Sequence, residues 1–210
     1  MIRVFIADDH ELIRMGVKKV IRTSKDIRIV GEASNIAEML QFVPQTKPDI
    51  VVLDINFPED DGLKGLMTLR RLFPELPVLI LSMFPEERFA IRALKAGAAG
   101  YISKAMAAEE LVEAIRKVMS VGTYISPRTA EILALDYRNP GSTFLHNRLA
   151  SRELQIVSLL GSGKQIKQIA AELSISISTV NTYRVRIFKK MGLRSNAELI
   201  RYAVEQQLVD

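Results

Sequence analysis

The sequence contains no cysteine, and none of its apolar runs approaches the length of a membrane span. A chain without cysteine has no disulfide and no metal site with thiolate ligands. The longest apolar runs fall far short of the roughly 18 residues that a transmembrane helix needs, so no membrane partner is expected. Asp8 and Asp9 interrupt the start of the chain, and we therefore expect no signal peptide. These absences favour a cytoplasmic protein.

The chain has 210 residues, of which 48% are hydrophobic, enough for one large or two small packed domains. Its charge is unevenly spread. Residues 1–119 contain 17 basic and 17 acidic residues, whereas residues 120–210 contain 12 and 7, so the net charge of +5 lies entirely in the second part. Such an excess favours a polyanion as partner, and the alternative is a solvated surface rich in lysine.

Short apolar segments alternate with amphipathic segments up to about residue 120. The segments predicted as strands are residues 3–7, 27–32, 49–54, 77–82 and 100–102. The segments predicted as helices are residues 10–23, 35–45, 63–73, 86–96 and 107–120. Strict alternation predicts an α/β domain with a doubly wound, five-stranded parallel sheet, helices on both faces and right-handed crossovers.

No strand pattern is visible after residue 151, where four helices fit the sequence. They are predicted at residues 151–160, 166–173, 177–191 and 195–207. Ser176 and Ser195 are suited to N-cap the third and the fourth helix. Only three residues join the second helix to the third, and this pair, at about 166–185, has the spacing of a helix-turn-helix. The second half is therefore predicted as an all-α domain.

A linker is predicted between the two parts, at residues 121–148. It contains a helix at about 128–137, for which Pro127 is a favourable start. Residues 138–144 are rich in turn formers and read as the linker proper.

Acidic, hydroxyl and basic side chains follow the ends of four predicted strands. Asp8 and Asp9 follow the first strand, Asp54 ends the third, Ser82 closes the fourth and Lys104 follows the fifth. In open α/β sheets, the carboxyl ends of the strands form the crevice in which ligands bind. We therefore expect these side chains to converge at one edge of the sheet.

Carboxylates that lie close together raise one another's pKa unless a cation joins them. Mg²⁺, or Mn²⁺, accepts such oxygen ligands, and we predict a site formed by Asp8, Asp9, Asp54 and the main-chain carbonyl of Asn56. Such a site can place a phosphoryl group on a carboxylate nucleophile, with Lys104 as a point charge on the phosphoryl oxygens. The alternative, in which the two N-terminal acids merely cap a helix and the lysine is a surface residue, is disfavoured because all four strand ends agree.

The combination of Asp8-Asp9, Asp54 with Pro58 and Asp61-Gly62, Ser82 and Lys104 resembles the receiver domain of two-component response regulators, over roughly residues 1–120. The resemblance implies the CheY- or flavodoxin-like fold. It implies that Asp54 is the phosphoacceptor, served by a histidine kinase or a small phosphodonor. It also implies that Ser82 and Tyr101 form a switch pair, in which the hydroxyl moves toward the phosphoryl group while the ring turns inward.

Helical spacing divides residues 177–191 into two faces. The face predicted to enter the core is Val180, the stem of Arg184, Ile187 and Met191. The opposite face is Ser178, Asn181, Thr182, Val185 and Lys189. On it, Val185 is suited to touch a thymine methyl, and Asn181 to bond N6 and N7 of adenine. The residues suited to DNA phosphates are Lys164, Thr179, Tyr183, Arg186 and Lys189, with Tyr183 and Arg184 divided between core and contact.

The segments at 149–153, 168–173 and 175–184 resemble the LuxR-type helix-turn-helix, and with the receiver they give the layout of the NarL/FixJ subfamily. The stretch from Thr179 to Arg186 is most similar to the GacA/UvrY branch. Ala150 stands where this family usually has a threonine that N-caps the helix, and Ser151 is the candidate replacement. In this family the last helix often pairs two DNA-binding domains, for which Leu199, Tyr202 and Ala203 form a candidate apolar ridge. For Leu199, packing within the domain is the favoured role.

These features predict a transcription regulator switched by phosphorylation, with a receiver at 1–120 and a DNA-binding domain at 149–210. The expected partners are double-stranded DNA, a sensor histidine kinase and a second copy of the chain, with RNA polymerase as a further candidate. Two alternatives belong to other classes. One is a Mg²⁺-dependent phosphohydrolase, which multiple turnover of a phosphoester would favour; the other is an adaptor whose helical half binds protein or RNA. The two histidines, His10 and His146, are assigned no catalytic or metal-binding role.

Overall fold

The computed structural model describes residues 1–57, 61–138, 145–206 and 208–209. Pro58 of the receiver motif and residues 139–144 of the predicted linker lie outside the described residues. The chain divides into two compact units, residues 1–140 and residues 141–210. Every predicted strand and helix is present, and each boundary lies within two residues of the prediction.

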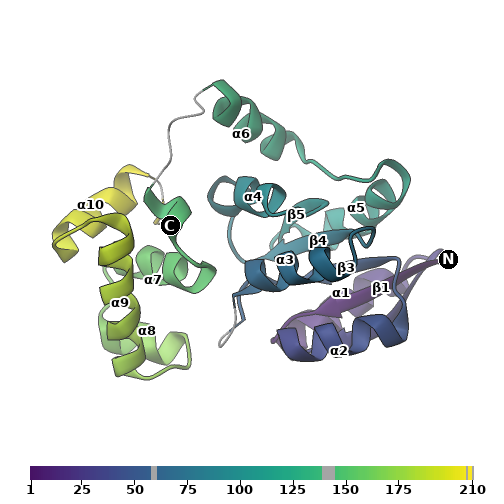
Figure 1. Ribbon diagram of the computed structural model, residues 1–210, viewed down its shortest axis with the longest axis horizontal. Helices are drawn as coiled ribbons and strands as arrows, with labels where there is room; N and C mark the ends of the chain where they lie inside the picture. Colours follow the sequence, from purple (N-terminus) through teal and green to yellow (C-terminus); the bar gives the residue numbers. More distant parts are fainter. Residues whose placement is uncertain (58–60, 139–144, 207, 210) are drawn as a thin grey trace. The chain divides into compact units, whose positions relative to one another are not determined.

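The first unit is built on a five-stranded parallel sheet in the order β2-β1-β3-β4-β5 (Figure 1). The strands are β1 (Ile2–Ala7), β2 (Ile27–Ala33), β3 (Ile50–Leu53), β4 (Val78–Ser82) and β5 (Gly100–Ser103). All residues of β3 and β4 are buried, as expected for apolar runs that are covered on both faces of a parallel sheet. The chain adds β2 on one side of β1 and then adds β3 on the other side. This switch in strand order places a crevice at the carboxyl ends of β1 and β3.

Helices cover both faces of this sheet. They are α1 (Glu11–Arg22), α2 (Ile36–Thr46), α3 (Gly62–Leu72), α4 (Glu86–Lys95) and α5 (Ala107–Val121). The apolar faces of α1 and α5 meet over one side of the sheet, in a core that includes Ile21, Val52 and Ile115. Right-handed crossovers put α2, α3 and α4 on the other side.

A further helix, α6 (Pro127–Arg138), packs against α4 and belongs to the first unit. Two buried hydroxyl side chains at its start, Ser126 and Thr129, both donate hydrogen bonds to the Glu86 carboxylate, the latter at 2.6 Å. The Ser126 hydroxyl also caps the helix by accepting from the Thr129 amide at 3.0 Å. Because Glu86 is the first residue of α4, these hydrogen bonds connect the N-terminus of α6 to the N-terminus of α4.

The second unit consists of helices only among the residues that the structure describes. They are the 3-10 helix η1 (Leu145–Arg148), α7 (Ser151–Gly161), α8 (Ile166–Glu172), α9 (Ile177–Met191) and α10 (Asn196–Glu205). The predicted caps are confirmed: the hydroxyls of Ser176 and Ser195 accept from backbone amides of the first turn of α9 and of α10. Gly192 ends α9 with a φ of 70°, a left-handed conformation that glycine adopts without strain.

The start of α7 differs from the prediction that Ser151 caps it. The N-cap is Ala150, which has no side-chain acceptor, and Ser151 is the first helical residue. The Glu153 carboxylate instead reaches back to accept from the Ala150 amide at 2.7 Å. This carboxylate also binds Lys190 on α9 at 2.5 Å, so a nearly buried acid supplies half of a capping box and joins two helices.

Replacing Ala150 by threonine should therefore stabilise the second unit by about 1 kcal/mol, because the new hydroxyl would accept from a backbone amide in the first turn of α7. Ala150 already has the extended conformation of an N-cap, with φ −66° and ψ 162°, so no backbone change is needed. The measurement is urea unfolding of the whole chain, followed by circular dichroism. Ala150→Val is the control, since it adds the branched shape without the hydroxyl, and an equal gain in both variants would refute the capping explanation.

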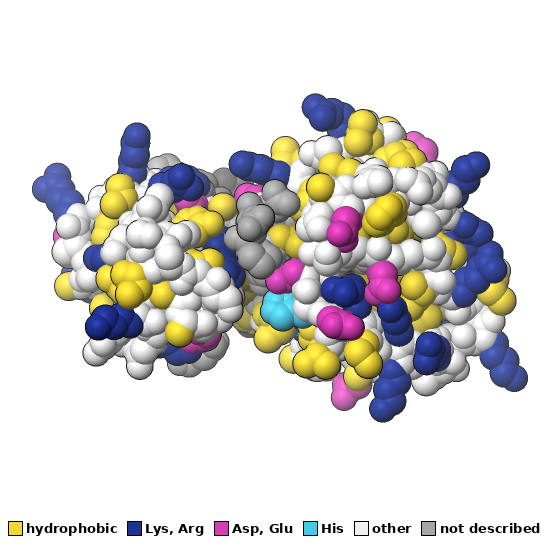
Figure 2. Space-filling view, turned by 90° about the horizontal axis from the view of Figure 1, so that it is seen from below, with side chains coloured by type: hydrophobic (Ala, Val, Ile, Leu, Met, Phe, Trp, Pro, Cys, Tyr) yellow, Lys and Arg dark blue, Asp and Glu magenta, His cyan; other side chains and the backbone are white. Residues whose placement is uncertain are grey.

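No described helix has both the length and the apolar composition required to cross a bilayer. On the face drawn in Figure 2, hydrophobic, acidic and basic side chains are interspersed over the first unit. The net charge of +5 lies in residues 120–210, which include the second unit.

Candidate phosphoacceptor site and nucleic-acid interface

Asp8 and Asp54 emerge side by side from two neighbouring strands. Strands β1 and β3 pair with Ala7 opposite Leu53, and the Asp54 amide donates to the Ala7 carbonyl at 2.8 Å. Both aspartates come directly after these partners and are buried. The parallel register therefore brings together two acids that lie far apart in the sequence.

Lys104 is the cation that joins them. Its Nζ lies 2.7 Å from Asp54 Oδ2 and 2.7 Å from Asp8 Oδ2, and only 4% of its side chain is exposed. It follows β5, two strands away from β3, so its ammonium group must extend along the sheet edge to the acids. The predicted convergence of Asp8, Asp54 and Lys104 is confirmed.

Burial raises the pKa of the Asp54 carboxyl to about 6; Lys104 opposes this shift, and the charge of Asp8 adds to it. The pKa of Lys104 is also raised, because attraction by Asp54 and Asp8 together outweighs its own desolvation. Burial therefore favours the neutral form of the Asp54 carboxyl group, and the adjacent ammonium of Lys104 favours its ionised form.

His10, which was assigned no role from the sequence, lies against the acids. Its Nδ1 is 2.9 Å from Asp9 Oδ1 and 3.4 Å from Asp8 Oδ1, at the N-cap position of α1. One ligand atom from each of Asp8, Asp9, His10 and Asp54 lies within 4.8 Å of the others. The imidazole is thus part of the cluster, although the sequence assigned it no role. Its position next to the acid pair was the signal that could have found it.

Asn56 is buried beside the acceptor. The main-chain N–H of Asn56 donates a hydrogen bond to Asp54 Oδ1 at 3.0 Å, and this bond orients the carboxylate. The side-chain amide has no hydrogen-bond partner at either Oδ1 or Nδ2 within the described part of the chain. A buried polar group of this kind is normally satisfied by protein, water or a ligand.

Ser82 and Tyr101 meet at the loop that follows β4. The fully buried Ser82 hydroxyl accepts from the Phe84 amide at 3.2 Å, and the Tyr101 hydroxyl donates to the Phe84 carbonyl at 2.8 Å. Tyr101 is 1% exposed, and burial raises its pKa while a hydrogen bond with Ser82 opposes that rise. The two predicted switch residues therefore hold the same loop, with the tyrosine ring turned inward.

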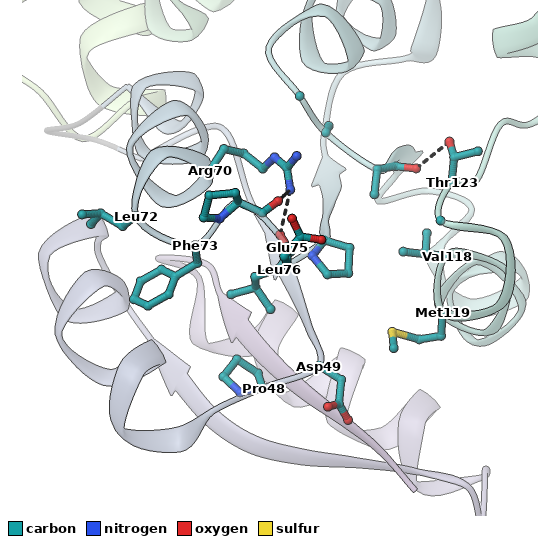
Figure 3. Close-up of a pocket in the computed structure, with 16 residues that line it drawn as sticks. Pro48, Asp49, Arg70, Leu72, Phe73, Glu75, Leu76, Val118, Met119 and Thr123 are labelled. Carbon is teal, nitrogen blue, oxygen red and sulfur yellow. Dashed lines mark hydrogen bonds between the residues drawn. The ribbon is translucent and has the colours of Figure 1, made fainter.

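A pocket of about 940 Å³ lies at the opposite edge of the sheet (Figure 3). Pro48 and Asp49 precede β3 and Pro77 precedes β4, so these lining residues stand at the amino ends of the strands. Arg70 crosses the pocket wall and donates to the carbonyls of Pro74 and Leu76. None of the predicted site residues lines this pocket, and the chemistry is therefore placed at the carboxyl edge.

In the second unit, α9 has the two predicted faces. Val180, Ile187 and Met191 are buried, and Arg184 is half-buried, as the spacing predicted for the core side. On the other side, Ser178, Thr182, Val185 and Lys189 are exposed and Asn181 is half-buried. Val185, an apolar residue, is 68% exposed on this polar stripe.

Several of the residues predicted to reach phosphates have protein partners. Lys164 Nζ is 2.6 Å from Glu172 in an exposed pair, and the Arg186 guanidinium lies 6.0 Å from the centre of the Tyr183 ring. The Thr179 hydroxyl lies 2.7 Å from that of Ser176. Exposed pairs of this kind contribute little to stability, so the basic groups remain available for an anion.

The apolar ridge predicted on α10 is not on the surface. Leu199 and Ala203 are fully buried within the second unit, because they face α7. Tyr202 is half-buried, and its hydroxyl lies 2.9 Å from Nδ1 of the buried His146. The large apolar residues that α10 does expose are Ile200 and Val204, at 38% and 55%. Burial of Leu199 agrees with its favoured role in packing, whereas burial of Ala203 leaves no exposed ridge of the three residues, because three residues of a ten-residue helix do not reveal which side faces its neighbour.

Both units match known families. Residues 4–116 match the family described as response regulator receiver domain, and residues 147–203 match the bacterial regulatory proteins of the luxR family. The response regulator GacA of Pseudomonas aeruginosa is 37% identical over 213 residues, which cover 100% of this chain and 99% of GacA. The response regulator UvrY of Escherichia coli K12 is 34% identical, over 99% of this chain and 96% of UvrY.

Among solved structures, RcsB from Salmonella enterica serovar Typhimurium, bound to promoter rprA, has the same fold. Its TM-score is 0.64 over 97% of this chain and 99% of RcsB, with 22% sequence identity. The receiver resemblance, the LuxR-type resemblance and the kinship to GacA and UvrY are thereby confirmed. This chain is a member of the response regulator family, with a receiver domain followed by a LuxR-type helix-turn-helix domain, and it is a transcription regulator rather than a catalytic enzyme.

Proposed function

We propose that phosphoryl transfer to Asp54 controls the binding of promoter DNA by the second unit. The observation that carries this proposal is the buried Asp54 carboxylate, held 2.7 Å from Lys104 in a chain that ends in a helix-turn-helix. The working boundaries are a receiver at 1–120, a linker at 121–148 and a DNA-binding domain at 149–210. The protein is cytoplasmic in this proposal.

The acid pocket fits a hard divalent cation, Mg²⁺ or Mn²⁺. Three of the four clustered side chains are carboxylates, one ligand atom from each of the four lies within 4.8 Å of the others, and the buried side-chain amide of Asn56 has no partner among the described residues. Asp8, Asp9, Asp54 and the main-chain carbonyl of Asn56 would hold it. When bound, the cation supplies positive charge for the oxygens of the incoming phosphoryl group.

The transfer itself is assigned to three side chains. An Asp54 oxygen attacks the phosphorus of a phosphohistidine on a sensor kinase, or of a small acyl phosphate, and the bond to the leaving group breaks as the new O–P bond forms. Lys104 is already in place to neutralise a phosphoryl oxygen, and the Ser82 hydroxyl donates to another. Hydrolysis of the adduct at Asp54 returns the chain to its starting state.

A movement of the Ser82 hydroxyl toward the phosphoryl group would reach α6 through a few contacts. The Tyr101 hydroxyl donates to the Phe84 carbonyl, and Glu86, two residues after Phe84, accepts from Thr129 in the first turn of α6. Since α6 is the last described helix before the second unit, a shift of the loop after β4 would be carried to the linker. Release of the DNA-binding domain and dimerisation of the chain are both routes from that point. Two half-sites in adjacent major grooves would be read by the dimer.

DNA recognition is assigned to α9 and its surroundings. The residues that read bases are Ser178, Asn181, Thr182 and Val185. The residues that contact phosphates are Lys164, Thr179, Tyr183, Arg186 and Lys189. RNA polymerase is a further candidate partner at the promoter. Since phosphate contacts release counterions, binding should weaken steeply with salt.

The deciding experiment follows one sample of whole protein through three measurements. Intact mass after incubation with acetyl phosphate and Mg²⁺ reports the adduct, fluorescence anisotropy at several salt concentrations reports DNA affinity, and light scattering separates release from dimerisation. One added phosphoryl group with tighter DNA binding supports the proposal. Multiple turnover of an external phosphoester would favour a phosphohydrolase instead. Binding to the helical half that double-stranded DNA does not compete away would favour an adaptor.

Removing one acid should weaken metal binding without unfolding the protein. In Asp9→Asn the site loses one negative charge, and we expect the Kd for Mg²⁺ to rise by roughly tenfold or more. Without the metal, the variant should be at least as stable as the wild type, because repulsion among the acids falls. Calorimetric titration with MgCl₂ measures the first effect. Asp61→Asn is the matched control, since Asp61 caps α3 through an oxygen that asparagine retains and lies outside the cluster.

A further inference from the structure

The sequence assigned Arg184 of α9 both to the core face and to the DNA-contacting residues. The structure gives its guanidinium group a defined set of partners. Its Nη1 donates to Oδ1 of Asn181 at 3.0 Å, one helical turn earlier. Its Nη2 donates to Oδ1 of Asn196, the first residue of α10, also at 3.0 Å. The guanidinium carbon lies 5.9 Å from the centre of the Phe188 ring. The guanidinium is thus held by two amides and an aromatic ring.

This arrangement fixes the direction of the Asn181 amide. A guanidinium group only donates hydrogen bonds, so the Asn181 atom that faces it must be the oxygen. The Nδ2 donor then points away from Arg184, and the oxygen keeps one lone pair for a second donor. Asn181 is half-buried on the stripe that also exposes Thr182 and Val185. An asparagine held in one orientation presents one donor and one acceptor in a set order.

We propose that Arg184 is a positioning residue for base recognition, which holds the Asn181 amide so that it reads adenine at one position of the half-site. Arg184 itself contacts no base in this arrangement. Adenine offers an N7 acceptor and an N6 donor in the major groove, the pattern that complements an oriented asparagine. The inference rests on the proposed DNA-binding function and specifies which residue determines the selectivity of that surface.

The test begins by selecting binding sites for the whole phosphorylated protein from a library of random double-stranded DNA. Affinities are then measured for the selected site and for every single base-pair change in it. Asn181→Ala should lose discrimination at one position by about tenfold, the range of one bidentate contact. Arg184→Met should lose discrimination at that same position, and the double variant should lose no more than either single one.

Two further variants separate positioning from phosphate contact. Arg184→Lys keeps the charge but cannot donate to both amides with the planar fork, so it should also lose discrimination. Arg186→Met is the matched control, in which affinity should fall for all sequences alike, with a shallower dependence on salt.

Asn196→Ala removes the second anchor of Arg184 without altering the DNA-facing stripe, and it should reduce discrimination at the same position. This variant keeps the test decisive if Arg184→Met does not fold. A uniform loss of affinity in Arg184→Met, or a loss at a different base pair from Asn181→Ala, would overturn the inference and leave the proposed function standing. A selection that enriches no sequence would overturn both.

Discussion

Asp54→Asn protein should gain no phosphoryl group from acetyl phosphate, and its DNA affinity should not respond to the donor. An amide of the same shape is not a nucleophile. It keeps only one of the two carboxylate oxygens, so either the Asn56 amide or the Lys104 ammonium loses its acceptor. Wild type under the same conditions should gain one phosphoryl group and bind its site roughly 5- to 150-fold more tightly, the usual range of coupling between two sites. Intact mass and fluorescence anisotropy on the same samples measure both effects.

Asp61→Asn serves as the control here as well, and should be phosphorylated like wild type. A phosphorylated wild type with unchanged DNA affinity would leave the assignment of Asp54 standing and refute the coupling. Absence of any adduct in wild type, with DNA binding intact, would indicate a regulator that does not depend on a small phosphodonor.

The second large effect is expected from Lys104→Met. This change leaves the buried carboxylates of Asp8 and Asp54 without their shared cation, and removing one partner of a buried pair costs about 3–5 kcal/mol. The free energy of unfolding of the first unit should therefore fall by about that amount in metal-free buffer. Urea unfolding with EDTA measures it.

Mg²⁺ should restore much of this loss, because the variant's unpaired carboxylates would bind the cation more tightly than those of wild type, and a ligand of the folded state stabilises in proportion to its occupancy. Lys95→Met is the matched control. Lys95 forms a pair with Asp136 at 2.6 Å, but 66% of its side chain is exposed, so the loss should stay under about 1 kcal/mol. Equal losses in the two variants, or no difference between EDTA and Mg²⁺, would contradict the role of Lys104 in joining the acids.

Features that depend on neighbouring residues could be predicted from the sequence, and features that depend on contacts between distant elements could not. Elements were predictable because their signals are local: β-branched runs for β3 and β4, and capping serines for α9 and α10. The capping of α7 was not, because Glu153 acts both on its own helix start and on Lys190 of another helix. Burial of Ala203 was not predictable for a related reason, since it depends on where α7 lies.

By itself, the sequence determined the alternation of strands and helices, the residues that end four strands of one sheet, the two faces of α9 and the family to which the chain belongs. These follow from periodicity and from the rule that parallel strands end at a common edge. Only the tertiary structure decided that His10 joins the acids, that α6 is anchored to Glu86, and that Arg184 holds Asn181 from one side and Asn196 from the other. The contacts of Glu86 with α6 and of Arg184 with Asn196 join different elements, and those of His10 with Asp9 and of Arg184 with Asn181 depend on side-chain direction; periodicity encodes neither.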